Sequence, residues 1–374
     1  MNQFEVDFKT PNRRYAIYPI IHDRIARQPD STDSDEKISN VFNFVWCRDL
    51  NAPELLAYYE KVGFGGVVGN VQYGRNYPNN AKAWQNAAAG FRECAKNGLH
   101  SWIYDEKGYP SGTAGGAVTE ADPNFIAEGL VFYEFAFSVY GPGFFRADTP
   151  PDRLYKALLI PIAGGEPIDI TEFADEYGTL RFDVPEGSYR LVLMSSRVLY
   201  DGTHVTENLS DPRYCVNLAD RDATRKFIEV THEKYFEVCG EEFGKSILAF
   251  FTDEPSLIAW HIRPGTFPML PWHSSFPQEF KKRYGYPIVD AVLAVFRNAG
   301  EQTVKRRCDF WEFIADQVAA NYFGEIQEWC HAHGLKSSGH MLWEEKLCWH
   351  VHNYGSFYRC AKRLDWPGID QLSC

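Results

Sequence analysis

Short apolar runs alternate with helical patterns along most of this 374-residue chain. Runs that resemble β-strands start near residues 41, 64, 99, 190, 247, 335 and 364. Helical patterns at residues 51–61, 81–97, 220–239 and 304–331 separate most of them. This alternation is typical of a parallel sheet covered by helices, and it predicts an α/β fold of the (β/α)8 TIM-barrel type.

The number of strands decides whether such a barrel can close. Seven candidates are one fewer than a TIM barrel requires. The sequence stops at Cys374, a few residues after the last candidate strand, Leu364–Ile369. We therefore expect either that Tyr15–Ile21 supplies the eighth strand or that the barrel is incomplete at its C-terminus.

A stretch of β-type composition interrupts the alternation between residues 125 and 188. Its strand-like runs, separated by turns rich in Gly and Pro, are Phe132–Phe137, Tyr155–Ala163 and Thr179–Val184. This pattern predicts an all-β insertion after the third strand, between two parts of a catalytic barrel at residues 1–124 and 189–374. The run Tyr189–Ser196 fits either the last strand of the insertion or the fourth strand of the barrel.

The run Ile247–Phe251 leads into two acids, Asp253 and Glu254. In a parallel barrel the carboxyl ends of the strands face the substrate. Cleavage of a glycosidic bond needs one carboxylic acid to protonate the leaving oxygen and a second carboxylate on the other side. Glu254 is the candidate acid, because partial burial beside Asp253 would raise its pKa. The alternative is that Glu254 caps a helix or lies in a loop before Pro255.

A second acid pair, Glu344 and Glu345, follows the run Lys336–His340. Adjacent side chains on a strand or turn diverge, so only one of the two can point into a cleft. We take Glu344 or Glu345 as the second catalytic carboxylate and prefer Glu345. The alternative is an ordinary acidic helix start at Trp343.

Asp105 and Glu106 end the third strand, Leu99–Tyr104, and should lie at the same edge of the barrel. We expect them to bind substrate hydroxyls or to hold the loop Pro110–Gly116, whose glycines permit close backbone approach. The other residues expected to bind substrate are Tyr104, Asp253, His340, Trp343 and Asp370.

Histidines near these acids make a metal-dependent hydrolase an alternative. His340 lies four residues before Glu344, at the end of a strand where catalytic groups belong. His331 and His333 precede that strand, which places them at the wrong end of a barrel. His340 could also bind a hydroxyl, orient Glu345 or be an ordinary packing histidine, so the residues alone assign no metal ligands.

Composition restricts the partners and the compartment. The formal net charge of −12 argues against a nucleic-acid partner. The longest apolar runs fall far short of the roughly 20 residues of a membrane helix, so no membrane partner is expected. The polar N-terminus has no apolar secretion segment, which predicts a cytoplasmic protein. Nine cysteines without a Cys-x-x-Cys pair predict reduced thiols rather than disulfides or a zinc ribbon.

Four motifs resemble, in order, those of glycoside hydrolase family 106, the α-L-rhamnosidases, and their relatives. They are Trp102–Gly116, Phe251–Pro255, Ser338–Glu345 and Leu364–Asp370. The resemblance implies a (β/α) barrel that acts on glycosides, with inversion and a bound calcium ion in the rhamnosidases.

Members of that family usually continue beyond the last of these motifs, into the final barrel strand and accessory β domains. A further glutamate in that continuation takes part in the chemistry, and this sequence lacks it. We expect a glycoside hydrolase, α-L-rhamnosidase-like, that uses carboxylate acid/base catalysis on a carbohydrate substrate. The alternatives are a metal-dependent hydrolase and a non-catalytic sugar-binding barrel fragment.

Overall fold

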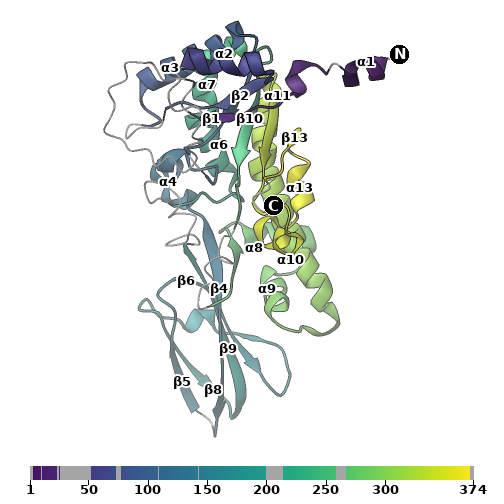
Figure 1. Cartoon of the computed structure of the whole chain (residues 1–374). Coiled ribbons are helices and arrows are strands. Elements are labelled where there is room, and N and C mark those ends of the chain that lie inside the picture. The colour runs from purple at the N-terminus through teal and green to yellow at the C-terminus, as the bar shows by residue number, and fades with distance from the viewer. Residues whose placement is uncertain are drawn as a thin grey trace. The chain divides into compact units, whose positions relative to one another are not determined.

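The computed structural model describes residues 3–9, 11–22, 25, 52–72, 77–107, 109–141, 143–198, 214–257 and 267–370. Two compact units divide the chain. The first comprises Met1–Ile126, Val205–Leu257 and Ala291–Cys374. The second comprises Ala127–His204 and Ile258–Asp290. Figure 1 labels the elements of both units.

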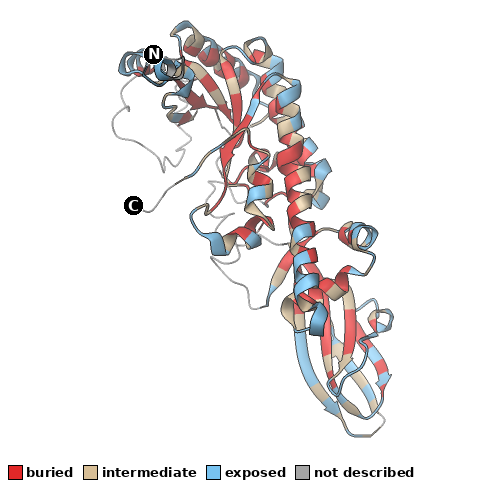
Figure 2. Cartoon of the chain, turned by 90° about the vertical axis from the view of Figure 1, so that its right-hand side faces the viewer, coloured by how far each residue is buried: buried red, intermediate tan, exposed pale blue. Residues whose placement is uncertain are grey.

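The first unit is built on a parallel sheet in which the strands follow one another in chain order. The strands are β1 (Ile20–His22), β2 (Gly66–Gly69), β3 (His100–Tyr104), β10 (Ile247–Asp253), β12 (Lys336–His340) and β13 (Trp366–Pro367). Side chains such as Val67, Ile103 and Phe250 are almost completely buried, and Figure 2 shows buried residues along these strands. Burial on both faces explains why strands such as β2 and β10 are continuous apolar runs in the sequence.

These strands confirm the α/β class. Expected strands near residues 64, 99, 247, 335 and 364 correspond to β2, β3, β10, β12 and β13, and Tyr15–Ile21 overlaps β1. The expected strand at Val41–Trp46 lies outside the described residues. Within the described ranges β1 and β13 each pair with a single neighbour, so the sheet formed by these residues is open. A closed eight-stranded barrel is therefore not shown.

Helices connect the strands of the parallel sheet, apart from α1, which precedes β1. They are α1 (Gln3–Lys9), α2 (Ala52–Val62), α3 (Ala81–Lys96), α4 (Ala117–Ala121), α6 (Arg221–Val230), α7 (His232–Cys239), α10 (Thr303–Val318), α11 (Glu325–Ala332), α12 (Leu347–Tyr354) and α13 (Phe357–Ala361). The Asn80 side chain caps α3 by accepting the N–H of Ala83 at 3.1 Å. The helix expected at residues 220–239 divides into α6 and α7 at Thr231, whose backbone is not helical.

The helix expected at residues 304–331 is present but contains a π-helical turn, Ala319–Gly324, between α10 and α11. Such turns insert an extra residue into a helix and are frequent near functional sites. In this turn Tyr322 is fully buried, and its hydroxyl lies 3.2 Å from Oγ1 of Thr252 on β10. The π-helical turn therefore contacts the strand that ends in Asp253.

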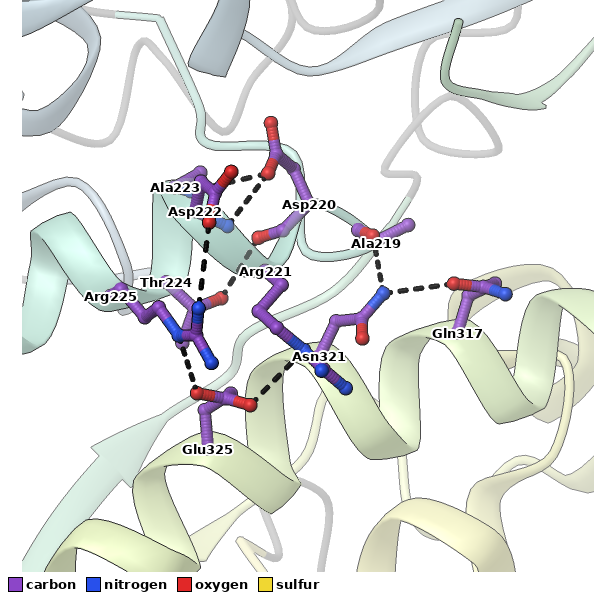
Figure 3. A network of polar contacts seen from close by, with 10 residues as sticks. All are labelled: Ala219, Asp220, Arg221, Asp222, Ala223, Thr224, Arg225, Gln317, Asn321 and Glu325. Carbon is purple, nitrogen blue, oxygen red and sulfur yellow. Dashed lines mark hydrogen bonds and ion pairs between the residues drawn. The ribbon is translucent and has the colours of Figure 1, made fainter. Parts of the chain in front are cut away.

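A polar network joins the π-helical turn and α11 to α6 (Figure 3). Glu325 accepts Nε of Arg221 at 3.1 Å and Nε of Arg225 at 3.0 Å. Asn321, within the π-helical turn, donates to the carbonyl of Ala219 at 2.7 Å. Ion pairs near the surface contribute about 1 kcal/mol or less each, so this network mainly fixes how α6 and α11 lie against each other.

The second unit contains a five-stranded antiparallel sheet and a two-stranded one. The larger sheet has the order β11 (Met269–Trp272), β4 (Glu128–Val139), β9 (Gly187–Val198), β6 (Arg153–Pro161) and β7 (Ile168–Asp169). In the smaller sheet β5 (Gly143–Asp148) pairs with β8 (Thr179–Val184). Leu159, Leu180, Phe182 and Leu191 belong to one apolar core. The unit also holds α8 (Phe276–Tyr284), and α9 (Ile288–Phe296) begins in it.

The boundary expected at residue 188 is corrected by this arrangement. The run Tyr189–Ser196 lies in β9, which pairs with β4 and β6 and so belongs to the antiparallel sheet. The unit also takes in Ile258–Asp290, whose strand β11 pairs with β4. Pairing between segments more than a hundred residues apart leaves no local signal in the sequence, and this is why β11 was not anticipated.

The described residues bear on two expectations from composition, one about membrane helices and one about cysteines. Within them, none of the helices is long and apolar enough to cross a membrane. Of the seven cysteines in the described ranges, five are buried and two are exposed.

Candidate functional site

Four residues other than glycine have a left-handed backbone in the described part of the chain. They are His22, Ala114, Glu254 and Trp343, with φ between 50° and 62°. His22 ends β1, Ala114 lies in the loop after β3, Glu254 follows β10, and Trp343 follows β12. Strained backbone of this kind concentrates at functional sites. The carboxyl edge of the parallel sheet is therefore the candidate site.

His340, the last residue of β12, lies between two carboxylates. Its Nε2 is 2.6 Å from Oδ1 of Asp253, and its Nδ1 is 3.0 Å from Oε1 of Glu344. Burial alone would lower the pKa of His340, but hydrogen bonds to Asp253 and Glu344 raise the pKa to about 10. The ring is therefore an imidazolium at neutral pH, with both nitrogens donating.

Glu344 connects β12 to the segment after β13. Its side chain is 4% exposed. Its Oε1 accepts the backbone N–H groups of Met341 at 3.1 Å and of Asp370 at 3.2 Å. Burial would favour the neutral acid, yet the contacts with His340 and these N–H groups hold the pKa of Glu344 below its ordinary value. Glu344 is thus a carboxylate used for internal bonding.

Tyr104, the last residue of β3, orients Asp253 from the other side. The buried Tyr104 hydroxyl donates to Oδ2 of Asp253 at 2.5 Å. Burial, together with the charge of Asp253, raises the pKa of Tyr104 well above its usual range, so the hydroxyl keeps its proton. Both oxygens of Asp253 accept hydrogen bonds, one from Tyr104 and one from His340, and the carboxylate is fixed between β3 and β12.

Glu254 follows Asp253 and is the acid best suited to proton transfer. Burial, followed by the charge of Asp253, raises the pKa of Glu254 to about 7. A carboxyl with that pKa can hold a proton near neutral pH and release it during a reaction. One carboxylate oxygen of Glu254, one of Asp370 and a ring nitrogen of His340 all lie within 4.8 Å of one another.

The structure places Glu344 and Glu345, the two candidates for the second catalytic carboxylate, in different surroundings. Glu345 is exposed on the turn before α12, whereas Glu344 contacts His340. The two side chains do diverge, as their neighbouring positions require. The His340 ring and the N–H groups of Met341 and Asp370 attract the carboxylate of Glu344, and that local attraction cannot be seen in the sequence.

Asp105 lies beneath the site rather than on its surface. It is 2% exposed, and its Oδ1 accepts the hydroxyl of Ser111 at 2.6 Å. Burial raises the pKa of Asp105 well above its ordinary value, and the hydrogen bond from Ser111 offsets only part of this effect. Of the two roles expected for Asp105, this contact fits the one in which it holds the loop Pro110–Gly116.

Ser111 links the loop after β3 to the end of β10. Its Oγ accepts the N–H of Asp253 at 2.8 Å, and its own N–H donates to the carbonyl of Asp253 at 2.8 Å. These reciprocal bonds fix the backbone of Asp253, which precedes Glu254. Ser111 was missed as a site residue because its spacing from the acids in sequence carries no signal.

Glu106 anchors the loop after β3. It is completely buried. Its carboxylate accepts backbone N–H groups at 2.6 to 3.1 Å from Lys107, Gly112, Thr113, Ala114 and Gly115. Of the two roles expected for Glu106, the structure supports the one in which it holds the loop, because the carboxylate is surrounded by donors from the loop itself.

Trp343 is half-buried on the turn after β12. The ammonium group of Lys346 lies 4.3 Å from the centre of its ring, and Trp349 packs edge-to-face against it at 5.3 Å. One face of Trp343 is therefore covered by Lys346 and is not available for stacking on a sugar.

Comparison with known protein families shows to which family the chain belongs. The model of glycoside hydrolase family 106, described as alpha-L-rhamnosidase, matches residues 153–348. The matched span is more than half of the chain and includes Asp253, Glu254, His340 and Glu344. The chain belongs to glycoside hydrolase family 106.

Two further proteins are similar to this family 106 chain. The solved structure of a rhamnosidase from Novosphingobium sp. PP1Y matches 98% of this chain with a TM-score of 0.56 and 13% identity. That match covers 49% of the rhamnosidase, so this chain spans about half its length and shares its fold. A protein from Formosa agariphila with the provisional name beta-glucuronidase is 32% identical over 75 residues, which are 19% of this chain and 6% of that protein.

The calcium ion implied by the resemblance to family 106 can be tested against the donor set. Calcium binds six to eight oxygen ligands. Glu254 and Asp370 offer carboxylate oxygens close together, but the third member of the group, His340, offers nitrogen. Both ring nitrogens of His340 already donate to carboxylates. These three residues therefore do not by themselves fit a calcium site, nor a zinc site that uses His340.

Proposed function

We propose that this chain carries the acid/base site of a glycoside hydrolase that acts on α-L-rhamnosides, with Glu254 as the general acid. The observation that carries the proposal is the position of Glu254 at the end of β10, where its carboxyl group lies within 4.8 Å of His340 and Asp370. Membership of family 106 supports the substrate class. The six described parallel strands, joined by helices, support a (β/α)8 barrel of which they would be part.

In this proposal Glu254 protonates the oxygen of the leaving group as the glycosidic bond breaks. The proton comes from a carboxyl group whose pKa of about 7 keeps it largely protonated in mildly acidic solution. The imidazolium of His340 holds Asp253 and Glu344 in place beside the acid. These side chains are pre-positioned, so little reorganisation is required during proton transfer.

Asp370 has a different role in the proposal. Its nearest oxygen lies within 4.8 Å of Glu254, which is closer than the roughly 6.5–9.5 Å between the two carboxyl groups of inverting glycosidases. An inverting reaction needs space for a water molecule between acid and base. We therefore assign Asp370 to binding sugar hydroxyls, and the base of an inverting reaction to a carboxylate farther from Glu254.

The experiment compares Glu254→Gln with a matched control, Glu345→Gln, on a panel of aryl glycosides that includes an α-L-rhamnoside and a β-D-glucuronide. We expect hydrolysis of the rhamnoside by the full chain, a loss of kcat of about 100-fold or more in Glu254→Gln, and less than about twofold change in the control. Sugar binding without turnover would contradict the enzyme proposal and support a binding module. Activity that chelation abolishes and zinc restores would favour a metal-dependent hydrolase.

A further inference from the structure

Two polar residues stand at the carboxyl ends of β1 and β2, on the side of the sheet away from His340. His22 is the last residue of β1, and Asn70 directly follows β2. His22 is half-buried and has a left-handed backbone with φ of 51°, whereas Asn70 is completely buried. A buried asparagine has a fixed amide group, so it can impose an orientation on a neighbour that reaches the surface.

The hydrogen bonds of Asn70 determine which nitrogen of His22 carries the proton. The Asn70 amide nitrogen donates to the carbonyl of Val71 at 2.7 Å, so its Oδ1 faces the other way. That oxygen lies 3.2 Å from Nδ1 of His22. An amide oxygen only accepts hydrogen bonds, and Nδ1 must therefore donate. In the neutral ring, Nε2 is then the acceptor.

The neighbours of Val71 make this orientation rigid. The N–H of Val71 donates to the Tyr235 hydroxyl at 2.8 Å, and Tyr235 is 1% exposed. The residue whose carbonyl accepts the Asn70 amide, Val71, is thus also held through its N–H by a buried side chain of α7. A rotated Asn70 would place two donors against His22 or lose the bond to Val71, and either change leaves a buried polar group without its partner.

His22 is also linked, through Tyr104, to the residues proposed for catalysis. Its ring packs edge-on against Tyr104, with the ring centres 5.0 Å apart and the planes at 77°. The hydroxyl of Tyr104 donates to Asp253, which precedes Glu254. His22 is therefore two side chains away from the proposed acid, along the same edge of the parallel sheet. Within the described ranges its Nε2 has no hydrogen-bond partner.

We infer that His22 and Asn70 form a second wall of the sugar site, in which Nε2 of His22 accepts a hydrogen bond from one hydroxyl of the substrate. This inference rests on the proposed glycosidase function and adds a determinant of specificity. A hydroxyl can donate to Nε2, whereas a carboxylate or sulfate group offers only acceptors. The wall therefore selects a neutral sugar with a hydroxyl at this position over an acidic sugar.

The test measures binding, because binding separates this inference from the catalytic proposal. The full chain with Glu254→Gln is titrated calorimetrically with L-rhamnose and with each of its monodeoxy analogues, and the series is repeated with His22→Ala added. In the first background we expect one analogue to bind about 10-fold more weakly than rhamnose. After His22→Ala, that analogue and rhamnose should bind equally, while the ratios for the other analogues stay the same.

A third background, His22→Gln, is the conservative control, because a glutamine side chain can again present an acceptor. It should restore discrimination against the same analogue. The role of His22 would be overturned if His22→Ala left the ratio of the affinities for rhamnose and for each analogue unchanged. It would also be overturned if a uronic acid bound more tightly than rhamnose. Failure of Glu254→Gln to bind any sugar, with a normal unfolding transition, would instead overturn the proposed function.

Discussion

The Nε2 atom of His340 lies 2.6 Å from Oδ1 of Asp253, across the boundary between strands β12 and β10. The imidazolium thereby ties the carboxyl ends of two neighbouring strands together with a charge-assisted hydrogen bond. On its other side the same ring binds Glu344 at 3.0 Å. The stability of this edge of the sheet should therefore depend on the protonation of one ring, and the first prediction uses this dependence.

The first prediction concerns stability at alkaline pH. Folding raises the pKa of His340 to about 10, from an unfolded value near 6.5. The stabilisation of the folded state by protonated His340 is therefore complete below pH about 6.5, and it disappears as the pH rises through about 10. Denaturant unfolding of the chain should thus show falling stability across this window. In His340→Gln the decrease should be clearly smaller. Equal slopes for the two proteins would show that the ring does not hold the extra proton.

The second prediction concerns the pH dependence of turnover. Glu254 must be protonated to act as an acid, and its pKa is raised to about 7. The value of kcat/KM should therefore fall as the pH rises through about 7. A dinitrophenyl glycoside, whose leaving group needs little protonation, should show a weaker decrease than a phenyl glycoside. An identical decrease for both substrates would assign it to a group other than the acid.

The third prediction concerns Ser111 as a positioning residue. Ser111→Ala removes the acceptor for the N–H of Asp253, so the end of β10 should shift. We expect kcat to fall by about 10- to 100-fold with KM nearly unchanged, together with about 1–3 kcal/mol of lost stability. Ser111→Thr keeps the hydroxyl and should recover most of kcat. A purely structural role would give the loss of stability without the change in kcat.

The fourth prediction concerns Glu106 and its loop. Glu106→Gln places an amide against five backbone N–H donors, so some of them lose their acceptor. We expect the free energy of unfolding to fall by about 2–4 kcal/mol. The exposed Glu345→Gln should change it by no more than about 0.5 kcal/mol. Similar values for the two variants would mean that the loop does not depend on this carboxylate.

Several features of the fold could be read from the sequence because their cause is local. Buried parallel strands require continuous apolar runs, and these runs located five strands of the sheet. Helix periodicity located the helices between them, and the acids after β10 and β12 marked the edge where polar side chains gather. The run Tyr189–Ser196 fitted two assignments, because an apolar run does not reveal whether its partners are parallel or antiparallel. The pairing of β9 with β4 and β6 decided between them.

The roles of individual acids at that edge could not be read from the sequence. Asp105 and Glu106 are adjacent, yet one contacts Ser111 and the other a ring of loop N–H groups. Glu344 and Glu345 are adjacent, yet only Glu344 contacts His340. Each outcome depends on donors contributed by other segments, and those donors come together only in the folded chain.

The sequence by itself determined the class of fold, the acid-tipped strands and the family to which the chain belongs, since apolar periodicity and motif order are properties of the linear chain. Only the tertiary structure decided which carboxylates are buried and bonded to other parts of the chain. It also decided that the carboxyl group with a pKa raised to about 7 is that of Glu254. Burial and charge neighbours set a pKa, and both are defined only when strands distant in sequence lie side by side.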